Sequence, residues 1–173
     1  FTLASSKQCT VTGGTPTNGT YNCIIDYSLI TGGSVAANEI VQYFVIAQDI
    51  LTPTPNVGTN PGGATSTDVN TVTVYPAAPN AYTILPTISG NKTVGAGGDY
   101  ATLTLAVAAV NASEVTGPVT LTLTNPLYDT AGGEVFPIVL NANTGSSATN
   151  TITIKPGAGN SPVITGSSAS CIF

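Results

Sequence analysis

The sequence contains no histidine, arginine, methionine or tryptophan, and its only basic side chains are three lysines. Histidine is the commonest general base and the commonest metal ligand, so its absence removes the Ser–His nucleophile pair and most transition-metal sites. Lys7, Lys92 and Lys155 are scattered along the chain, whereas phosphate contacts need clustered cations. We therefore expect no nucleic-acid partner, no resident cofactor and no enzymatic activity.

Charged residues make up only 6% of the 173 residues, against roughly a quarter in ordinary soluble domains, and the formal net charge is −5. Threonine, serine, asparagine and glycine supply the polarity instead, which is typical of extracellular β-proteins and fibre subunits. No apolar run approaches the roughly 20 residues that span a bilayer, so we expect no membrane insertion. The composition indicates an extracellular or cell-surface protein, and we expect any export signal to lie upstream of Phe1 or to have been removed.

The chain has three cysteines. Cys9 and Cys23 flank the turn-rich segment 15–20, which would let two antiparallel strands meet, so a disulfide between them is favoured over two buried thiols. A disulfide implies an oxidising compartment. Cys171 is left over, and it is either buried or paired with a residue beyond Phe173 or on another chain.

Residues 1–77 read as short strands separated by turn signals, which predicts an all-β fold and a β-sandwich related to the immunoglobulin fold. The apolar run 40–47 is too hydrophobic on both faces for an exposed edge, so we expect it at the centre of the sandwich. The strand count is low, which predicts an incomplete sandwich. The proline-rich segment 78–90 is expected to be a linker or a crossing strand. The strands expected in this half are 24–29, 40–47 and 70–75.

One stretch changes to helical spacing. Apolar residues fall three or four positions apart, which predicts a short amphipathic helix over 102–111. Thr102 is the expected N-cap, although Leu105 stands where a capping box would have Glu or Gln. The helix residues expected to face the core are Tyr100, Leu103, Val107 and Val110. The strands expected after the helix are 118–124, 136–140, 151–154 and 162–164.

Two groups of residues resemble parts of large surface proteins of the Bacteroidota that are exported by type IX secretion. Segments 26–29, 32–33, 41–49 and 54–58 resemble the latter half of an Ig-like module in these proteins. The pattern Asp99-Tyr100-x-Thr102-Leu103, with 117–119, 148–156 and 164–169, is similar to the start of their right-handed parallel β-helices. The resemblance implies an Ig-like module over 1–77, a linker over 78–90, and a β-helix start over 91–173 whose first coil is capped by the short helix. It also implies that the missing strands lie before Phe1 or come from a partner, and that further coils follow Phe173.

Two carboxylate pairs are candidates for chemistry. Asp129 and Glu134 lie five residues apart around a glycine turn and could share a loop as a catalytic pair, a calcium site or a solvated turn. Asp49 and Asp68 are a second calcium candidate if their loops face each other.

Three functions stay open on the sequence. The favoured one is a non-enzymatic structural or adhesive module, part of a long stalk or of a fibre whose subunits are joined by β-strand addition. The alternatives are an accessory N-terminal region of a β-helix carbohydrate-active enzyme and a carbohydrate-binding module. The expected partners are further copies of the chain, or other cell-surface proteins and glycans.

Overall fold

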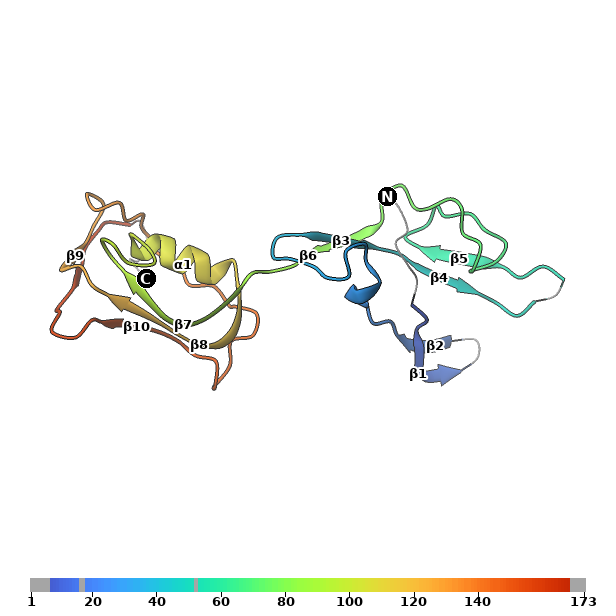
Figure 1. Cartoon of the computed structure of the whole chain (residues 1–173), viewed down its shortest axis with the longest axis horizontal. Coiled ribbons are helices and arrows are strands. Elements are labelled where there is room, and N and C mark those ends of the chain that lie inside the picture. The colour runs from blue at the N-terminus through green and yellow to red at the C-terminus, as the bar shows by residue number, and fades with distance from the viewer. Residues whose placement is uncertain (1–6, 16–17, 52, 169–173) are drawn as a thin grey trace. The chain divides into compact units, whose positions relative to one another are not determined.

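The structure is a computed structural model that describes residues 7–15, 18–51 and 53–168. It divides into two compact units, Phe1–Ile84 (unit 1) and Leu85–Phe173 (unit 2), whose elements are labelled in Figure 1. Strands make up most of the regular structure, and the described residues contain a single α-helix, in agreement with the all-β class. In these described ranges no helix is both long enough and apolar enough to cross a membrane.

Unit 1 begins with an antiparallel hairpin of β1 (Thr10–Thr15) and β2 (Asn18–Asn22). The predicted disulfide between Cys9 and Cys23 is confirmed, and it joins the residue before β1 to the residue after β2 at the base of this hairpin. Most side chains of both strands are exposed. The hairpin is therefore stabilised by its backbone hydrogen bonds and its disulfide, and not by a hydrophobic core. Cys171 lies outside the described residues.

The rest of unit 1 consists of two further two-stranded antiparallel sheets. One pairs β3 (Ile40–Tyr43) with β6 (Asn80–Thr83), and the other pairs β4 (Val45–Gln48) with β5 (Val57–Asn60). The expectation of one central strand over 40–47 is therefore wrong. The run is divided at Phe44, and each half belongs to a sheet of two strands.

Two strands expected in unit 1 are absent, because side chains bind the local backbone there. Segment 24–29 contains instead the 3₁₀ turn η1 (Tyr27–Leu29), capped by the Asp26 carboxylate, which accepts the Ser28 N–H. Segment 70–75 makes one isolated bridge, between Thr65 and Val74. Its start is held in a turn by Asp68, whose Oδ1 accepts the Asn70 N–H at 2.7 Å.

The proline-rich segment 78–90 contains β6 and the first half of β7 (Thr87–Val94). Pro86 falls between the two strands, where a missing N–H interrupts neither ladder. The boundary between the two units lies within this segment, at Ile84 and Leu85.

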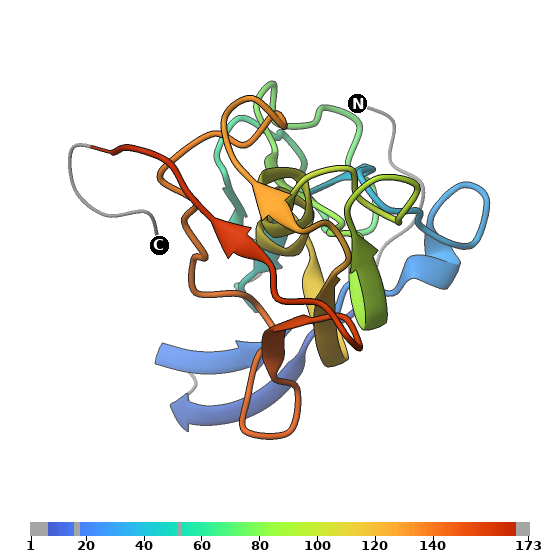
Figure 2. The same cartoon turned by 90° about the vertical axis from the view of Figure 1, so that its left-hand side faces the viewer.

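Unit 2 is built from parallel strands. β8 (Glu114–Leu123) lies between β7 and β10 (Ile152–Pro156), and β9 (Leu127–Tyr128) pairs in parallel with β11 (Val163–Ile164). Figure 2 looks onto this unit and shows β9 beside β11. β8, β10 and β11 each pair in parallel with a strand that lies roughly 30 residues earlier in the chain.

The hydrophobic core of unit 2 lies between α1 (Leu103–Asn111) and the parallel sheet. Alternate side chains of β8 point into it, because successive strand residues face opposite sides of a sheet. On α1, Leu103, Val107 and Val110 are buried, and Tyr100 packs half-buried against the same cluster. The buried residues of the strands are Ile88, Val94, Val115, Val119, Leu121, Leu123 and Tyr128, and Ile138 joins them from the segment after β9.

The start of α1 follows the capping chemistry expected from the sequence. Thr102 is the N-cap, and its Oγ1 accepts the Leu105 N–H at 3.1 Å. The turn before the helix is closed by Asp99, whose Oδ2 accepts both the N–H and the hydroxyl of Thr93 at 2.7 Å. These bonds to Thr93 lower the pKa of Asp99, because they stabilise the ionised carboxylate.

Candidate functional site

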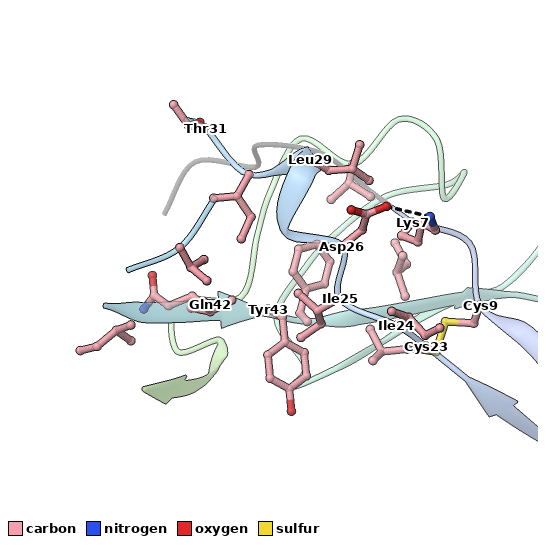
Figure 3. Close-up of a pocket in the computed structure, with 18 of the residues that line it drawn as sticks. Lys7, Cys9, Cys23, Ile24, Ile25, Asp26, Leu29, Thr31, Gln42 and Tyr43 are labelled. Carbon is pink, nitrogen blue, oxygen red and sulfur yellow. Dashed lines mark hydrogen bonds and ion pairs between the residues drawn. A yellow bond between two sulfur atoms is a disulfide. The ribbon is translucent and has the colours of Figure 1, made fainter. Parts of the chain in front are cut away.

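The described part of unit 1 contains a groove of about 850 Å³, shown in Figure 3. We call it the unit 1 groove. It begins at the Cys9–Cys23 disulfide, passes η1 and follows the whole run from Ile40 to Ile46. Its remaining apolar lining consists of Ile24, Ile25, Leu29, Ile30, Val35, Val69 and Val72.

Unit 1 has almost no closed core around this groove. Among its described residues, only Val41 and Pro76 are buried. Large apolar side chains remain in contact with solvent, and Ile40 at the start of the run is 67% exposed. Apolar side chains along the groove therefore stay open to solvent.

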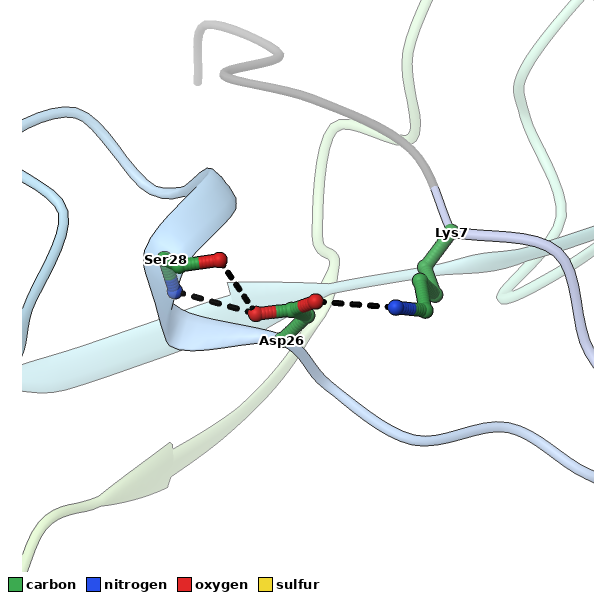
Figure 4. Close-up of polar contacts among 3 residues, drawn as sticks. All are labelled: Lys7, Asp26 and Ser28. Carbon is green, nitrogen blue, oxygen red and sulfur yellow. Dashed lines mark hydrogen bonds and ion pairs between the residues drawn. The ribbon is translucent and has the colours of Figure 1, made fainter.

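One rim of the groove carries an ion pair, drawn in Figure 4. Lys7 Nζ lies 2.9 Å from Asp26 Oδ2, and the other carboxylate oxygen accepts the Ser28 hydroxyl at 2.6 Å and the Ser28 N–H at 3.1 Å. The Lys7 hydrogen bond, with the Ser28 bonds after it, lowers the pKa of Asp26 from 3.8 to about 2. The pair leaves this rim without net charge.

The lowered pKa of Asp26 predicts a measurable pH dependence. Because the folded value lies below the unfolded one, the contribution of this carboxylate to stability is present above pH 3.8 and is lost as the pH falls toward 2. Replacing Lys7→Ala removes the largest cause, so the pKa of Asp26, followed by carboxyl-carbon NMR, should rise part of the way back toward 3.8. Lys92→Ala, in unit 2, is the control and should leave it unchanged. An unaltered titration of Asp26 in the Lys7 variant would contradict the ion pair.

Tyr43, which lines the groove, belongs to a cluster of three tyrosines. The Tyr82 hydroxyl donates to the Tyr27 hydroxyl at 2.9 Å, and the rings of Tyr43 and Tyr82 meet edge to face with centroids 6.1 Å apart. Burial, together with the Tyr27 bond, raises the pKa of Tyr82 to about 12. The rings pack against one another at an angle and do not form the flat exposed platform on which a sugar ring stacks.

The hairpin at the end of the groove depends on its disulfide. An isolated two-stranded hairpin is marginal in water, and this one has little side-chain packing. We expect the double variant Cys9→Ser/Cys23→Ser to lose hydrogen-exchange protection over β1 and β2 while β7 and β8 keep theirs. Equal protection of the hairpin in both proteins would show that the cross-link does not hold it.

The calcium candidate at Asp49 and Asp68 is not assembled. Asp49 accepts hydrogen bonds from the N–H and the side-chain amide of Asn56 and from the Leu51 N–H, and these bonds lower the pKa of Asp49. Asp68 accepts the Asn70 N–H. Each carboxylate thus closes its own loop. Across the described residues, no three acidic or cysteine side chains gather closely enough to hold a metal ion.

Asp129 and Glu134 likewise do not form a pair, because each binds a different part of the backbone. Asp129 closes the glycine turn, its Oδ1 accepting the Gly132 N–H at 2.7 Å. Glu134 is only 4% exposed, and its two oxygens accept the Leu103 and Thr104 N–H groups at 2.7 and 2.8 Å. These are free donors of the first turn of α1, so Glu134 is a helix cap supplied from a distant part of the chain.

The segment 134–143 continues along α1 and binds its other end. The Asn111 side-chain amide donates to the Val139 carbonyl at 2.7 Å and accepts the Asn141 N–H at 3.0 Å. It thus binds this backbone with one donor and one acceptor, as the backbone of a neighbouring strand does. Asn143 donates to the Val110 carbonyl at 2.7 Å. The strand expected over 136–140 is therefore wrong: this stretch forms no ladder, and its Val139 carbonyl is bound by the Asn111 side chain. We call residues 134–143 the helix clamp.

The buried hydroxyl of Tyr128 is a further hydrogen-bonding centre of unit 2, and no sequence motif predicted it. Tyr128 is buried, and its hydroxyl donates to the Val94 carbonyl and accepts the N–H groups of Thr124 and Asn125 at 3.0 and 3.1 Å. It joins the end of β7 to the turn after β8. A tyrosine two residues after a proline carries no local signal for this role.

Comparison of the chain with models of known families, with curated proteins and with solved structures finds no match. No relative therefore assigns a role to the unit 1 groove or to the capped helix. What bears on function is the chemistry of the two units themselves: an apolar groove in unit 1, and parallel strands packed against a helix in unit 2.

Proposed function

We propose that the chain is a non-enzymatic structural module of an extracellular surface protein, and that it associates with further copies of itself by β-strand addition. The observation that carries this proposal is the unit 1 groove, which runs beside strands that belong to sheets of only two. Ordering the backbone of one residue costs about 1–2 kcal/mol, whereas burying one Val-sized side chain returns about 1.5–3 kcal/mol. With only Val41 and Pro76 buried among its described residues, unit 1 needs further apolar burial, which an added strand supplies.

We further propose that unit 1 is a partial Ig-like sandwich and that unit 2 begins a right-handed parallel β-helix. In support, β7, β8 and β10 stack in parallel at intervals of roughly 30 residues, and β9 and β11 do the same beside them. α1 covers the apolar face of this stack, as a cap on the first coil would. A parallel stack is stiff and extends by repetition, which suits a stalk.

The proposed location outside the cell is supported by the Cys9–Cys23 disulfide and by the scarcity of charge. Both are compatible with a secreted protein, and the resemblance to type IX secretion cargo of the Bacteroidota suggests the route. In this proposal the hydroxyl and amide side chains form the surface of a stalk or fibre.

Association is tested by light scattering after gel filtration over a wide range of concentration, with negative-stain electron microscopy of the most concentrated sample. We expect oligomers or filaments that dissociate on dilution. Ile40→Lys places a charge at the groove without disturbing a buried side chain and should weaken association by about ten-fold or more. Val139→Lys, an exposed site of similar chemistry in unit 2, should leave it unchanged. A monomer at all concentrations would contradict the proposal.

A further inference from the structure

The hairpin of β4 and β5 carries two neighbouring apolar side chains that face solvent. Ile50 is 97% exposed and Leu51 is 57% exposed, just beyond the end of β4 in Figure 1. We call these two residues the β4–β5 tip. Because Ile50 is almost fully exposed, the tip does not lie in the unit 1 groove of its own copy. Apolar surface left in water in this way favours association with another apolar surface.

Hydrogen bonds hold the β4–β5 tip in place. Asp49 Oδ1 accepts the Leu51 N–H at 3.1 Å and the Asn56 N–H at 2.8 Å, and Asp49 Oδ2 accepts the Asn56 side-chain amide at 2.7 Å. The carboxylate therefore closes the loop at its base and fixes the backbone beside the two apolar side chains. A loop that is already ordered loses less conformational freedom on binding, so the tip is prepared for insertion into another surface.

The unit 1 groove offers a complementary apolar surface. Ile24, Ile40 and Val45 line it, and their exposed fractions are 65%, 67% and 37%. Contact with these side chains uses no backbone group, so it is compatible with the sheets that unit 1 already forms. The groove volume of about 850 Å³ lies within the range of roughly 300–1,000 Å³ that is usual for ligand pockets. The groove therefore has room for the apolar side chains of an inserted loop.

We propose that the β4–β5 tip of one copy inserts into the unit 1 groove of a second copy. This inference rests on the self-association proposed above, and it adds a contact between side chains to the pairing of strands. The tip and the groove are different surfaces of the same unit, so each copy is the donor to one neighbour and the acceptor of another. Contacts of this head-to-tail kind produce an open chain of copies unless their rotation closes a ring.

The charges of the two surfaces agree with a second copy as the donor. The tip has no charge, and Asp49 lies directly before it. Lys7 is the only basic side chain of unit 1, and it lies on the groove rim with its side chain 51% exposed. Its ammonium group has three N–H donors, so donors remain for an incoming Asp49 beside the bond to Asp26. Glu39, the remaining charged lining residue, accepts the Ala36 N–H. An acidic copy therefore meets a cation at the rim.

Complementation between two variants tests the contact. Ile50→Lys places a charge on the tip and Ile40→Lys places one in the groove, both at exposed side chains. We expect each variant alone to associate about ten-fold more weakly than the unmodified chain, or weaker still, as measured by light scattering. An equimolar mixture should form 1:1 dimers in native mass spectrometry, because one variant keeps an intact groove and the other keeps an intact tip. Leu105→Lys, at an apolar position of unit 2 that is 54% exposed, is the control and should associate as the unmodified chain does.

The outcomes separate this contact from the self-association on which it rests. If Ile50→Lys forms oligomers as readily as the unmodified chain while Ile40→Lys does not, the tip is not the occupant and another segment fills the groove. If the mixed variants form no dimer although the unmodified chain forms oligomers, the head-to-tail arrangement is overturned. An unmodified chain that stays monomeric at all concentrations overturns self-association itself.

Discussion

Replacing Leu103→Ala is expected to lower the free energy of unfolding of unit 2 by about 2–5 kcal/mol. Leu103 is the first residue of α1 and is fully buried in the cluster that joins the helix to the sheet. Truncation removes its transfer free energy and leaves a cavity that the surrounding strands cannot close without breaking their ladder. Since a domain is stable by only about 5–15 kcal/mol, a loss of this size should be visible as a large fall in the melting temperature.

The chain supplies a matched control for this substitution. Leu105 lies two residues further along the same helix and is 54% exposed, so Leu105→Ala makes the same chemical change outside the core. Alanine is at least as good a helix former as leucine, and we expect a change below about 1 kcal/mol. Urea unfolding followed by hydrogen exchange of unit 2 peptides measures both variants in the full chain. Equal losses in the two would contradict the burial of Leu103 as the cause.

Replacing Glu134→Ala is expected to destabilise unit 2 by about 2–4 kcal/mol, because it leaves two N–H groups at the start of α1 without acceptors. The loss is larger than that of an ordinary exposed cap, since both the carboxylate and Leu103 are shielded from water. The first turn of α1 should exchange its amide hydrogens faster than the rest of the helix. Unfolding free energies and residue-level exchange give the two measurements.

Two variants separate the capping role of Glu134 from its charge. Glu134→Gln keeps one acceptor oxygen and should lose about half as much stability as the alanine variant. Glu114→Ala removes an exposed carboxylate at the start of β8 and should change stability by less than about 0.5 kcal/mol. If Glu134→Ala behaved like Glu114→Ala, the buried cap would have no energetic role.

The elements that local patterns predicted are those whose stabilising contacts lie close in sequence. The α1 helix, its Thr102 cap and the Cys9–Cys23 hairpin follow from spacing and side-chain chemistry within a few residues. The strands over 24–29 and 70–75 were wrong for the opposite local reason, because Asp26 and Asp68 capture nearby N–H groups and turn the chain. An aspartate just before or inside a strand pattern was the sequence signal for a turn in place of a strand.

The polar centres of unit 2 depend on partners that no local pattern connects. Glu134 caps a helix that begins about 30 residues earlier, and Asn111 pairs with a backbone segment equally far along the chain. In the sequence, Glu134 resembled one half of a carboxylate pair with Asp129. Only the tertiary packing of residues 134–143 along α1 brings Glu134 to the start of the helix.

By itself the sequence determined the residue classes that are missing, the strand-rich character of the chain, the short amphipathic helix and the hairpin disulfide, since each follows from composition or from contacts between near neighbours. Only the tertiary structure decided which strands pair in parallel, which carboxylate caps the helix, and that the apolar run over 40–47 is divided between two sheets beside a groove. The physical reason is that hydrophobic burial is non-directional: an apolar pattern states that a residue will be covered, whereas the fold decides what covers it.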